Sequence, residues 1–476
     1  MTPPLLAPPS GSPPPPAWAR LADAATVVLA LLAISALATG GFRTEVAGWR
    51  VSVTAWWRPA LAAVLVALAR HAACRAPSMA VRMVHGTARW WRDPTTQATW
   101  PVVAASRLGV LTIGLLAVFA IGFPEGRAPI RVAESEIGNL PARFDAGWYL
   151  GIATHGYEYQ PGRVDRQQNL VFFPAFPVLM SLGSLLLARQ ILWAGTLLSI
   201  VAFAWAARYL YRLAREMLDA DRAAAAVAFA ACYPFALFYS APYTEALFLL
   251  AMLGAWFHLR RDERWAAFGW GLLAGLTRPN GCLLSIPLAL VAVDPWWRGG
   301  RLQAPPGGWS TLADRFVVAA APGLGMLLYS AYIADLTGDP FTWIRLQAAW
   351  GRQNLGAGAF LFGEAEAIGQ LGVYQYATGN VPNFLNLLAL TLTAAALWPV
   401  ARRFGPAAAA LLLLNVVPSL ATGGLLSVGR ATTVLFPTFL WLADAVPARH
   451  RTAWLAAFAG LQAFAATLFF TWRQLF

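Results

Sequence analysis

A short polar segment of this chain carries the residue types that proton transfer needs. It runs from Arg143 to Tyr157, after an apolar stretch, and places Asp145 among aromatic side chains such as Trp148 and Tyr149. A carboxylate held there can accept a proton from an attacking hydroxyl, so Asp145 is the first candidate for a general base. The alternative is that Asp145 and Arg143 form a purely structural ion pair in the loop.

The loop that contains Asp145, residues 124–168, is close to neutral. It has six carboxylates and five arginines, whereas the whole chain has a formal net charge of +13. Cytoplasmic loops of membrane proteins keep the positive excess. A long loop without that excess is therefore expected on the outer side of a membrane.

The composition is typical of a polytopic membrane protein. Hydrophobic residues make up 58% of the 476 residues and charged residues only 12%. The arginines are spread over short loops, which fits orientation in a bilayer better than nucleic-acid binding. Since a spanning helix needs about 20 mostly apolar residues, we expect an all-α fold with about 13 transmembrane helices. They are predicted at residues 24–41, 59–73, 101–123, 191–211, 223–241, 245–259, 265–277, 281–293, 316–334, 384–401, 406–421, 431–447 and 453–472.

The arginines predict which side each loop faces. Their clusters can all share the cytoplasmic side with the N-terminus if these spans hold. Both long loops, 124–168 and 335–383, then face outward. We therefore expect the site on the extracytoplasmic face. The protein itself is expected to be integral to a bacterial inner (plasma) membrane.

Two segments depart from simple spans. If the apolar residues 172–188 crossed the membrane, the later arginines would change sides, so we expect a helix that lies on or dips into the outer leaflet. Residues 276–281 place an arginine, a proline and an asparagine inside an apolar stretch. Two short helices should meet there at the outer face.

The chain divides into four predicted parts. Residues 1–20 form a proline-rich extended tail, 21–100 a transmembrane hairpin with a basic cytoplasmic loop, 101–447 the core, and 448–476 a C-terminal transmembrane helix. The three cysteines, at positions 74, 232 and 282, are far apart. They support neither a disulfide framework nor a zinc site.

Five motifs occur in order over residues 100–447. They are the segment 143–157, Phe172-Phe173-Pro174-Ala175-Phe176-Pro177, Phe238-Tyr239-Ser240-Ala241-Pro242-Tyr243-Thr244-Glu245, Thr277-Arg278-Pro279-Asn280-Gly281, and Arg430 with Phe436-Pro437. Together they resemble the PIG-V family of polyprenyl-phosphate-mannose-dependent mannosyltransferases, which are related to GPI mannosyltransferase II and have the multi-spanning GT-C fold. Phe144 and Phe176 stand where the family has tryptophan and tyrosine. Another stretch resembles the family and could either cover the site or be structural: Gly338-Asp339-Pro340-Phe341, Gln347, Trp350 and Arg352.

The resemblance implies that the chain moves mannose from polyprenyl-phosphate mannose to a lipid-linked or glycan hydroxyl, with inversion and without a metal or other cofactor. Asp145 would be the base. Arg278 and Arg430 would hold the donor phosphate, because arginines at membrane depth are costly unless paired and a phosphate is a bidentate partner. Each could instead pair with a carboxylate such as Glu245, or extend to the interface.

Further residues are predicted to contact substrate: Arg143, Tyr149, His155, Tyr157, Tyr239, Glu245 and Asn280. Glu245 and Asn280 would orient the sugar, while His155 and Tyr157 would line the acceptor path. As alternatives, a glutamate suits the start of a helix through the helix dipole, and a loop histidine is often simply solvated. The expected partners are the sugar donor, the acceptor and membrane lipids, with no nucleic acid.

Two other functions stay open. The chain could be a transporter or flippase of a lipid-linked sugar, or a GT-C transferase of another sugar such as a pentose. Transporters tend to bind near mid-membrane, whereas the polar residues here gather toward one face. Asp219-Ala220-Asp221 matches a metal-binding motif of nucleotide-sugar transferases. It lies in a predicted cytoplasmic turn among arginines, and we interpret it as a solvated helix end.

Overall fold

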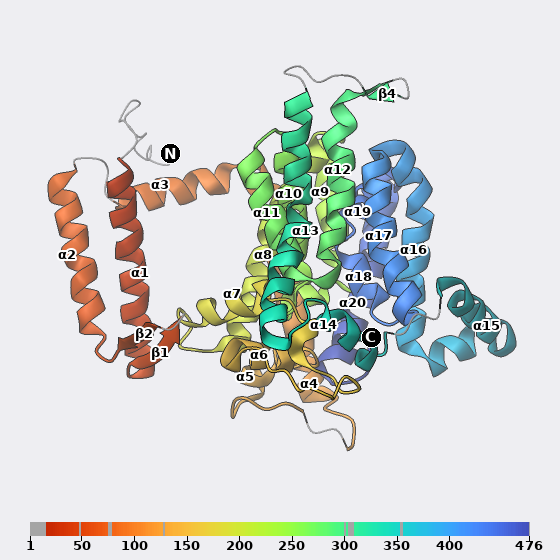
Figure 1. Ribbon diagram of the computed structural model, residues 1–476, viewed down its shortest axis with the longest axis horizontal. Coiled ribbons are helices and arrows are strands. Elements are labelled where there is room, and N and C mark those ends of the chain that lie inside the picture. The colour runs from red at the N-terminus through yellow and green to blue at the C-terminus, as the bar shows by residue number, and fades with distance from the viewer. Residues whose placement is uncertain are drawn as a thin grey trace. The chain divides into compact units, whose positions relative to one another are not determined.

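The fold is mainly helical, as predicted. The computed structural model describes residues 16–46, 49–74, 79–126, 129–298, 301–302, 309–352 and 356–475 (Figure 1). Two antiparallel hairpins in this part of the chain depart from the all-α expectation: β1 (Phe42–Val46) pairs with β2 (Trp49–Val53), and β3 (Trp297–Arg298) pairs with β4 (Arg301–Leu302). The described cysteines form no disulfide.

The chain forms two compact units. The first comprises Met1–Gln97 and Leu182–Gln190, and the second comprises Ala98–Ser181 and Ile191–Phe476. The predicted C-terminal helix belongs to the second unit, which also contains every residue of the predicted site.

The first unit is built on a pair of apolar helices. α1 (Ala17–Thr39) and α2 (Trp57–Ala73) pack along each other, and α3 (Met79–Arg92) follows. Nε of Arg70 lies 3.1 Å from Oδ1 of Asp23, and the Arg70 side chain is buried. An arginine can be buried between apolar helices because a carboxylate neutralises it.

The predicted proline-rich tail lies largely outside the described residues. For the last residues of the tail, the prediction of an extended backbone is wrong. α1 begins at Ala17, so residues 17–20 are helical rather than extended. The last proline of the run, Pro16, stands immediately before the helix, where a proline disturbs no hydrogen bond within the helix.

The second unit contains, wholly or for the most part, the remaining α-helices and the 3-10 helices, which are labelled η. In chain order these are α4 (Pro94–Ala120), α5 (Glu136–Asn139), α6 (Ala146–His155), η1 (Asn169–Val171), α7 (Ala175–Ser184), α8 (Ile191–Arg215), α9 (Ala220–Cys232), η2 (Ala236–Ser240), α10 (Glu245–Arg260), α11 (Arg264–Thr277), η3 (Pro279–Leu284), α12 (Ser285–Val293), η4 (Asp294–Trp296), α13 (Trp309–Thr337), α14 (Thr342–Arg345), η5 (Leu346–Trp350), α15 (Ala357–Gly379), α16 (Val381–Phe404), α17 (Pro406–Gly423), α18 (Val428–Thr433), α19 (Phe436–Ala445) and α20 (Ala448–Phe470).

α10 lies at the centre of the second unit. It is apolar on all sides, and nearly all of its residues are buried between neighbouring helices that include α8 and α11. A helix that is hydrophobic all round is expected in the interior. Its first residue, Glu245, is therefore held inside the protein although it is a carboxylate.

α11 and α13 cross closely at glycines. A Cβ at Gly325 would lie only 3.0 Å from the Cα of Gly275, and small residues allow membrane helices to approach in this way. α11 ends at Thr277, because Pro279 disfavours a helical backbone at the residue before it. Arg278 then adopts an extended backbone before η3 begins. The prediction that two helices meet at residues 276–281 is confirmed.

Among the described residues, seven helices are long and apolar enough to cross a membrane: α1, α4, α8, α13, α16, α17 and α20. The other predicted spans coincide with shorter helices. Residues 223–241 are interrupted between α9 and η2, and residues 431–447 between α18 and α19. Pro234 and Pro437 account for these breaks, because a proline cannot donate a hydrogen bond to the preceding turn. The finding supports a polytopic membrane protein with about seven candidate spans.

The two long loops lie at the same end of the second unit. Figure 1 shows α5, α6 and α14 at the lower end of this unit, while β4 lies at the upper end. This arrangement agrees with the prediction that the long loops and the arginine-rich turn near β4 lie on opposite sides. The apolar segment 172–188 contains α7, which has only 10 residues and is too short to span a bilayer.

Candidate active site

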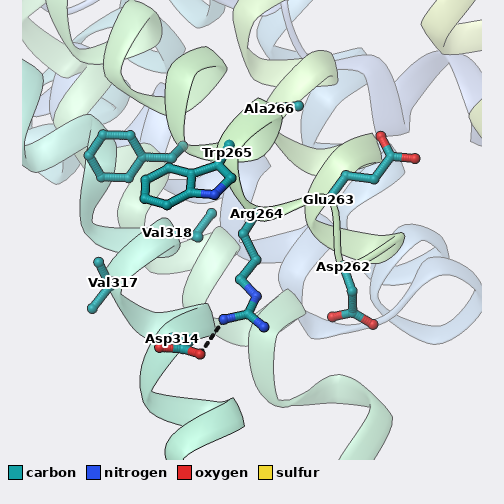
Figure 2. A pocket seen from close by; sticks show the side chains of 9 residues that line it. Asp262, Glu263, Arg264, Trp265, Ala266, Asp314, Val317 and Val318 are labelled. Carbon is teal, nitrogen blue, oxygen red and sulfur yellow. Dashed lines mark hydrogen bonds and ion pairs between the residues drawn. The ribbon is translucent and has the colours of Figure 1, made fainter.

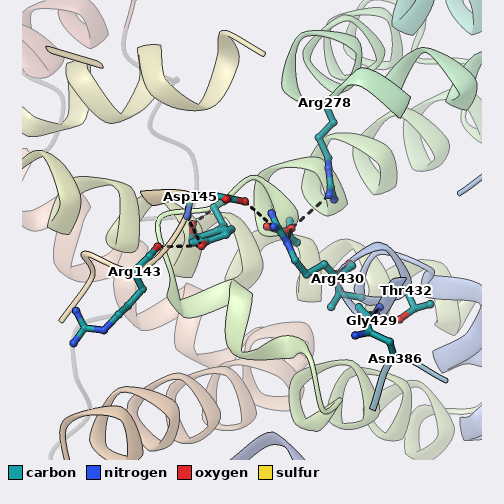
Figure 3. Close-up of polar contacts among 11 residues, drawn as sticks. Arg143, Asp145, Arg278, Asn386, Gly429, Arg430 and Thr432 are labelled. Carbon is teal, nitrogen blue, oxygen red and sulfur yellow. Dashed lines mark hydrogen bonds and ion pairs between the residues drawn. The ribbon is translucent and has the colours of Figure 1, made fainter. Parts of the chain in front are cut away.

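Four charged side chains from distant parts of the chain meet in the second unit. Asp145 precedes α6, Glu245 begins α10, Arg278 follows α11 and Arg430 lies in α18. Nη1 of Arg430 is 2.7 Å from Oδ2 of Asp145, and its Nε is 2.9 Å from Oε1 of Glu245. Nη2 of Arg278 lies 3.4 Å from the same Oε1. Figure 3 shows that Arg430 connects Asp145 with the rest of this charged cluster.

The charged cluster is largely removed from water. Glu245 is fully buried, and the side chains of Arg430 and Asp145 are 9% and 20% exposed. The Arg430 guanidinium also lies over the rings of Phe238 and Tyr243, with its Cζ 5.1 and 4.7 Å from their centroids. Each charge needs its partner, because an unpaired charge at this depth is costly to desolvate. The ring faces add a cation–π attraction.

One carboxylate oxygen of Asp145 remains available to a ligand. Oδ2 binds Arg430, whereas Oδ1 has no hydrogen bond to any residue in the described part of the chain. The side chain is partly exposed, so the carboxylate is not closed off from the outside. A carboxylate oxygen in this position can accept a proton while the guanidinium fixes the other oxygen.

A single tyrosine holds the backbone around Asp145. The hydroxyl of Tyr243 donates to the carbonyl of Arg143 and accepts from the N–H of Asp145, both at 3.0 Å. Phe144, between them, has a φ of 46°, a left-handed conformation that costs a bulky residue about 1–3 kcal/mol. Its ring packs against Phe469. Backbone strain of this kind clusters at functional sites, and the structure thus adds Tyr243, which the sequence did not single out beyond its motif.

The turn after α11 presents unused polar groups. Nη1 of Arg278 and Oε2 of Glu245 are buried, and neither has a hydrogen-bond partner among the described residues. Such groups are rare in native proteins and suit a site that a polar ligand completes. Nδ2 of Asn280 donates to Oδ1 of Asn415 at 3.0 Å, which ties the turn to α17.

Arg143, a predicted substrate contact, does not join the charged cluster. Its guanidinium is fully buried and donates to the carbonyls of Asn139, Ala142 and Phe470. Figure 3 shows it pointing away from Asp145. The ion pair considered between these two residues is therefore not formed, because the left-handed residue between them turns their side chains apart. Arg143 instead anchors the loop to α20.

Tyr239 is a core residue rather than a member of the charged cluster. Its hydroxyl donates to the carbonyl of Thr433 at 2.6 Å, and its ring stacks on Phe203 with centroids 4.3 Å apart. The side chain is fully buried. This packing leaves no surface on Tyr239 for the predicted substrate contact.

The remaining predicted contacts lie on or just after α6. Tyr149 is buried, and its ring meets that of Tyr243 edge-on at 6.2 Å, so it backs the charged cluster. His155 is exposed at the far end of the helix, about 15 Å from Asp145 at 1.5 Å per residue. The hydroxyl of Tyr157 donates to the carbonyl of Phe172 at 2.7 Å. His155 and Tyr157 could reach only the outer part of a large ligand.

The second long loop packs on the first. The Trp350 ring, in η5, meets the rings of Trp148 and Phe172 edge-on, at 5.2 and 5.1 Å. The contact places Trp350 of the predicted stretch beside α6, the helix that follows Asp145.

A groove of about 880 Å³ lies elsewhere in the second unit, between α11 and α13. Figure 2 shows Trp265, Val317 and Val318 on its walls, with an ion pair between Arg264 and Asp314. Arg264 begins α11 whereas Arg278 follows its end, a separation of about 20 Å along the helix. The groove therefore contains none of the predicted site residues.

The Asp219-Ala220-Asp221 segment is a helix start, as the sequence indicated. The Asp219 carboxylate caps α9 by accepting the N–H of Arg222 at 2.8 Å. This hydrogen bond holds the pKa of Asp219 below its usual value. Within the described ranges, no three His, Cys, Asp or Glu side chains are grouped as metal ligands would be.

Among solved structures, this chain is weakly similar to an enzyme of Archaeoglobus fulgidus. Its oligosaccharyltransferase, tethered to an acceptor peptide, is similar over 82% of this chain and 56% of its own, with 12% identity and a TM-score of 0.35. The apo form of that enzyme is similar over 78% and 56%, with 14% identity and a TM-score of 0.37.

Relatives found by sequence share a higher identity with this chain than these structures do. GPI alpha-1,6-mannosyltransferase 2 of Cricetulus griseus is 32% identical over 229 residues, which are 43% of this chain and 44% of the relative. The Homo sapiens protein of the same name is 29% identical over 215 residues, 40% and 42% of the two chains. The chain thus spans less than half the length of the curated relatives it matches.

The family comparison covers most of the charged cluster. Residues 129–293 match the family described as Mannosyltransferase (PIG-V). They include Asp145, Glu245 and Arg278, whereas Arg430 lies beyond the matched segment. Within this polytopic membrane protein, residues 129–293 are therefore similar to the PIG-V mannosyltransferase family.

Proposed function

We propose that this protein is a GT-C-type membrane mannosyltransferase that moves mannose from polyprenyl-phosphate mannose to an extracytoplasmic hydroxyl, lipid-linked or on a glycan. The observation that carries the proposal is one charged cluster in which the partly exposed carboxylate of Asp145 pairs with Arg430, and Arg430 shares Glu245 with Arg278. The family of residues 129–293 adds to it.

The reaction would be a single displacement with inversion. The acceptor hydroxyl attacks the anomeric carbon of mannose and forms the new glycosidic bond. The bond between that carbon and the phosphate oxygen breaks, and polyprenyl phosphate leaves with the electron pair. Oδ1 of Asp145 takes the hydroxyl proton, a role in which a positioned carboxylate typically contributes about 10²- to 10⁴-fold in rate.

The two arginines would stabilise the leaving phosphate. Negative charge develops on its oxygens as the bond breaks, and prepositioned donors in a water-poor site lower the barrier most where charge develops. Nη1 of Arg278 has no partner within the described chain and is the donor that needs no rearrangement. Arg430 would keep Asp145 oriented and would face the same phosphate. Glu245 would orient the sugar through its unused Oε2, with Asn280 on the neighbouring turn.

A transferase breaks the phosphate–mannose bond of the donor, whereas a transporter or flippase of lipid-linked sugar leaves it intact. Purified protein in lipid nanodiscs is incubated with labelled polyprenyl-phosphate mannose and a mixed lipid and glycan acceptor fraction. We expect label to leave the polyprenyl phosphate and appear in an acceptor, with or without EDTA. An intact phosphate–mannose bond would contradict the transferase. Labelled polyprenyl-phosphate pentose tests the alternative sugar in the same assay.

Replacing Tyr243 by phenylalanine should lower both stability and turnover. Without its hydroxyl, a buried carbonyl and N–H lose their partner, which should reduce the free energy of unfolding by about 1–3 kcal/mol. Asp145 would also lose the contact that fixes its backbone, so we expect kcat to fall about tenfold, one power of ten for 1.4 kcal/mol of lost positioning.

Tyr239→Phe is the matched control for this variant. It removes another buried tyrosine hydroxyl, which binds the carbonyl of Thr433, and should lower the melting temperature with little change in kcat of the folded enzyme. Equal kcat values for the two variants would show that Tyr243 does not position Asp145.

A further inference from the structure

Arg352 brings a third arginine to the charged cluster. It follows η5 in the second long loop, and its backbone N–H donates to the carbonyl of Gln347 at 3.3 Å. Its guanidinium lies against the end of α17, since a Cβ at Gly423 would be 3.4 Å from Nη1. The chain from α17 leads within a few residues to Arg430 in α18. Arg352 is thus held by a loop at the end of α17, close in the chain to α18.

Arg352 lies between elements that carry the cluster: Trp350, two residues before it, packs its ring on Trp148 of α6, and its guanidinium lies against the end of α17. Burial, with added repulsion from Arg430 and Arg278, holds the pKa of Arg352 below its usual value, and Asp145 acts in the opposite direction. These groups are therefore within electrostatic reach of one another. Among the described residues, however, no carboxylate forms an ion pair with Arg352. It differs in this from Arg278 and Arg430.

The charges at this place do not balance. Three guanidinium groups, of Arg278, Arg352 and Arg430, face two carboxylates, of Asp145 and Glu245, which leaves one positive charge. The carboxylates are already shared by Arg278 and Arg430. The excess charge is therefore carried by the arginine on the loop. A phosphodiester has one negative charge and two free oxygens, and an arginine binds such oxygens as a bidentate donor.

We infer that Arg352 binds the phosphate of the polyprenyl lipid, together with Nη1 of Arg278, and that the second long loop thereby becomes part of the donor site. The inference deepens the proposed function and rests on it for the identity of the lipid. Arg430, which also faces the phosphate, is occupied by two carboxylates and positions them. The sequence motifs pointed to Arg278 and Arg430, but the unpaired charge lies on Arg352.

Binding of the lipid product tests this assignment without any sugar transfer. The full chain is placed in nanodiscs of neutral lipid, and the dissociation constant of short-chain polyprenyl phosphate is measured. Arg352→Gln should weaken binding about 10- to 100-fold, the range expected when a charge-assisted hydrogen-bond pair is lost. Arg352→Lys keeps the charge without the planar fork, so it should lie between the wild type and Arg352→Gln.

Arg345→Gln is the matched control. Arg345 lies in the same loop, but it is exposed and paired with Asp339, so this variant should bind within about twofold of the wild type. The neutral polyprenol should bind all variants alike. The inference is overturned if Arg352→Gln binds polyprenyl phosphate as the wild type does, or if polyprenol binding falls in parallel.

Competition with inorganic phosphate tests whether the site binds the lipid or a soluble anion. It should compete weakly, because it lacks the chain that enters the membrane. If it displaced the lipid at equal concentration, the site would be one for soluble phosphate, and the lipid assignment would fail. Arg352-dependent lipid binding without mannose transfer would overturn the proposed function and leave this inference standing. Mannose transfer that does not depend on Arg352 would overturn this inference and leave the proposed function standing.

Discussion

Replacing Asp145 by asparagine should lower the rate of mannose transfer by about 10²- to 10⁴-fold, the usual contribution of a positioned general base. Asparagine has nearly the shape of aspartate, and its amide oxygen can still accept a hydrogen bond from Arg430. It cannot take up the proton of an acceptor hydroxyl. We therefore expect kcat to fall while donor binding and the melting temperature stay close to those of the wild type.

Two further variants make this test specific. Asp165→Asn changes an exposed carboxylate of the same long loop and should leave turnover unchanged. Asp145→Glu keeps a base but moves it by one methylene, so it should retain more activity than Asp145→Asn. Wild-type turnover by folded Asp145→Asn protein, measured with saturating donor, would rule out Asp145 as the base.

Replacing Glu245 by glutamine should have the largest effect on stability. Glu245 is fully buried and shared by Arg278 and Arg430, so the variant leaves two guanidinium groups at the same depth without their common counter-charge. Removing one partner of a buried ion pair usually costs about 3–5 kcal/mol. The melting temperature of purified protein should fall sharply, and turnover should be lost with it, because Arg430 would no longer be fixed next to Asp145.

Glu216→Gln provides the contrast. Glu216 also contacts two arginines, Arg260 and Arg261, but in a more exposed position. Solvent screens these pairs, so the loss should be less than about 1 kcal/mol. Similar small losses for both variants would show that the Glu245 cluster is not under the electrostatic constraint that its burial implies. The double variant Glu245→Gln with Arg430→Gln should then show no coupling between the two positions.

Several features could be predicted from local sequence because they depend on neighbouring residues. Apolar runs predicted where helices lie, and the arginine, proline and asparagine of residues 276–281 predicted the break after α11. The motif around Asp145 predicted a chemical role, and the same segment proved to carry a left-handed Phe144. The number of membrane-spanning helices was harder to predict. Hydropathy registers an apolar run whether it spans a bilayer or, like the residues of α10, is buried inside the protein.

Side-chain direction was not accessible from sequence neighbours. Arg143 is two residues from Asp145, yet it turns toward α20 and binds backbone carbonyls. Tyr239 and Tyr243 share one motif, but only Tyr243 contacts the backbone of Asp145. Arg143 and Asp145 diverge because of the φ angle of Phe144 between them. Tyr239 and Tyr243 diverge because the backbone between η2 and α10 is irregular.

The sequence by itself determined that this chain is a helical membrane protein with a loop suited to proton transfer, because composition and local motifs act over a few turns. The tertiary structure decided how the charges combine. It gave Arg278 and Arg430 one carboxylate in common, tied Asp145 to Arg430, and left the Arg352 charge without a carboxylate in the described chain. Ion pairs between residues hundreds of positions apart depend on how helices pack, and no local pattern of residues encodes that packing.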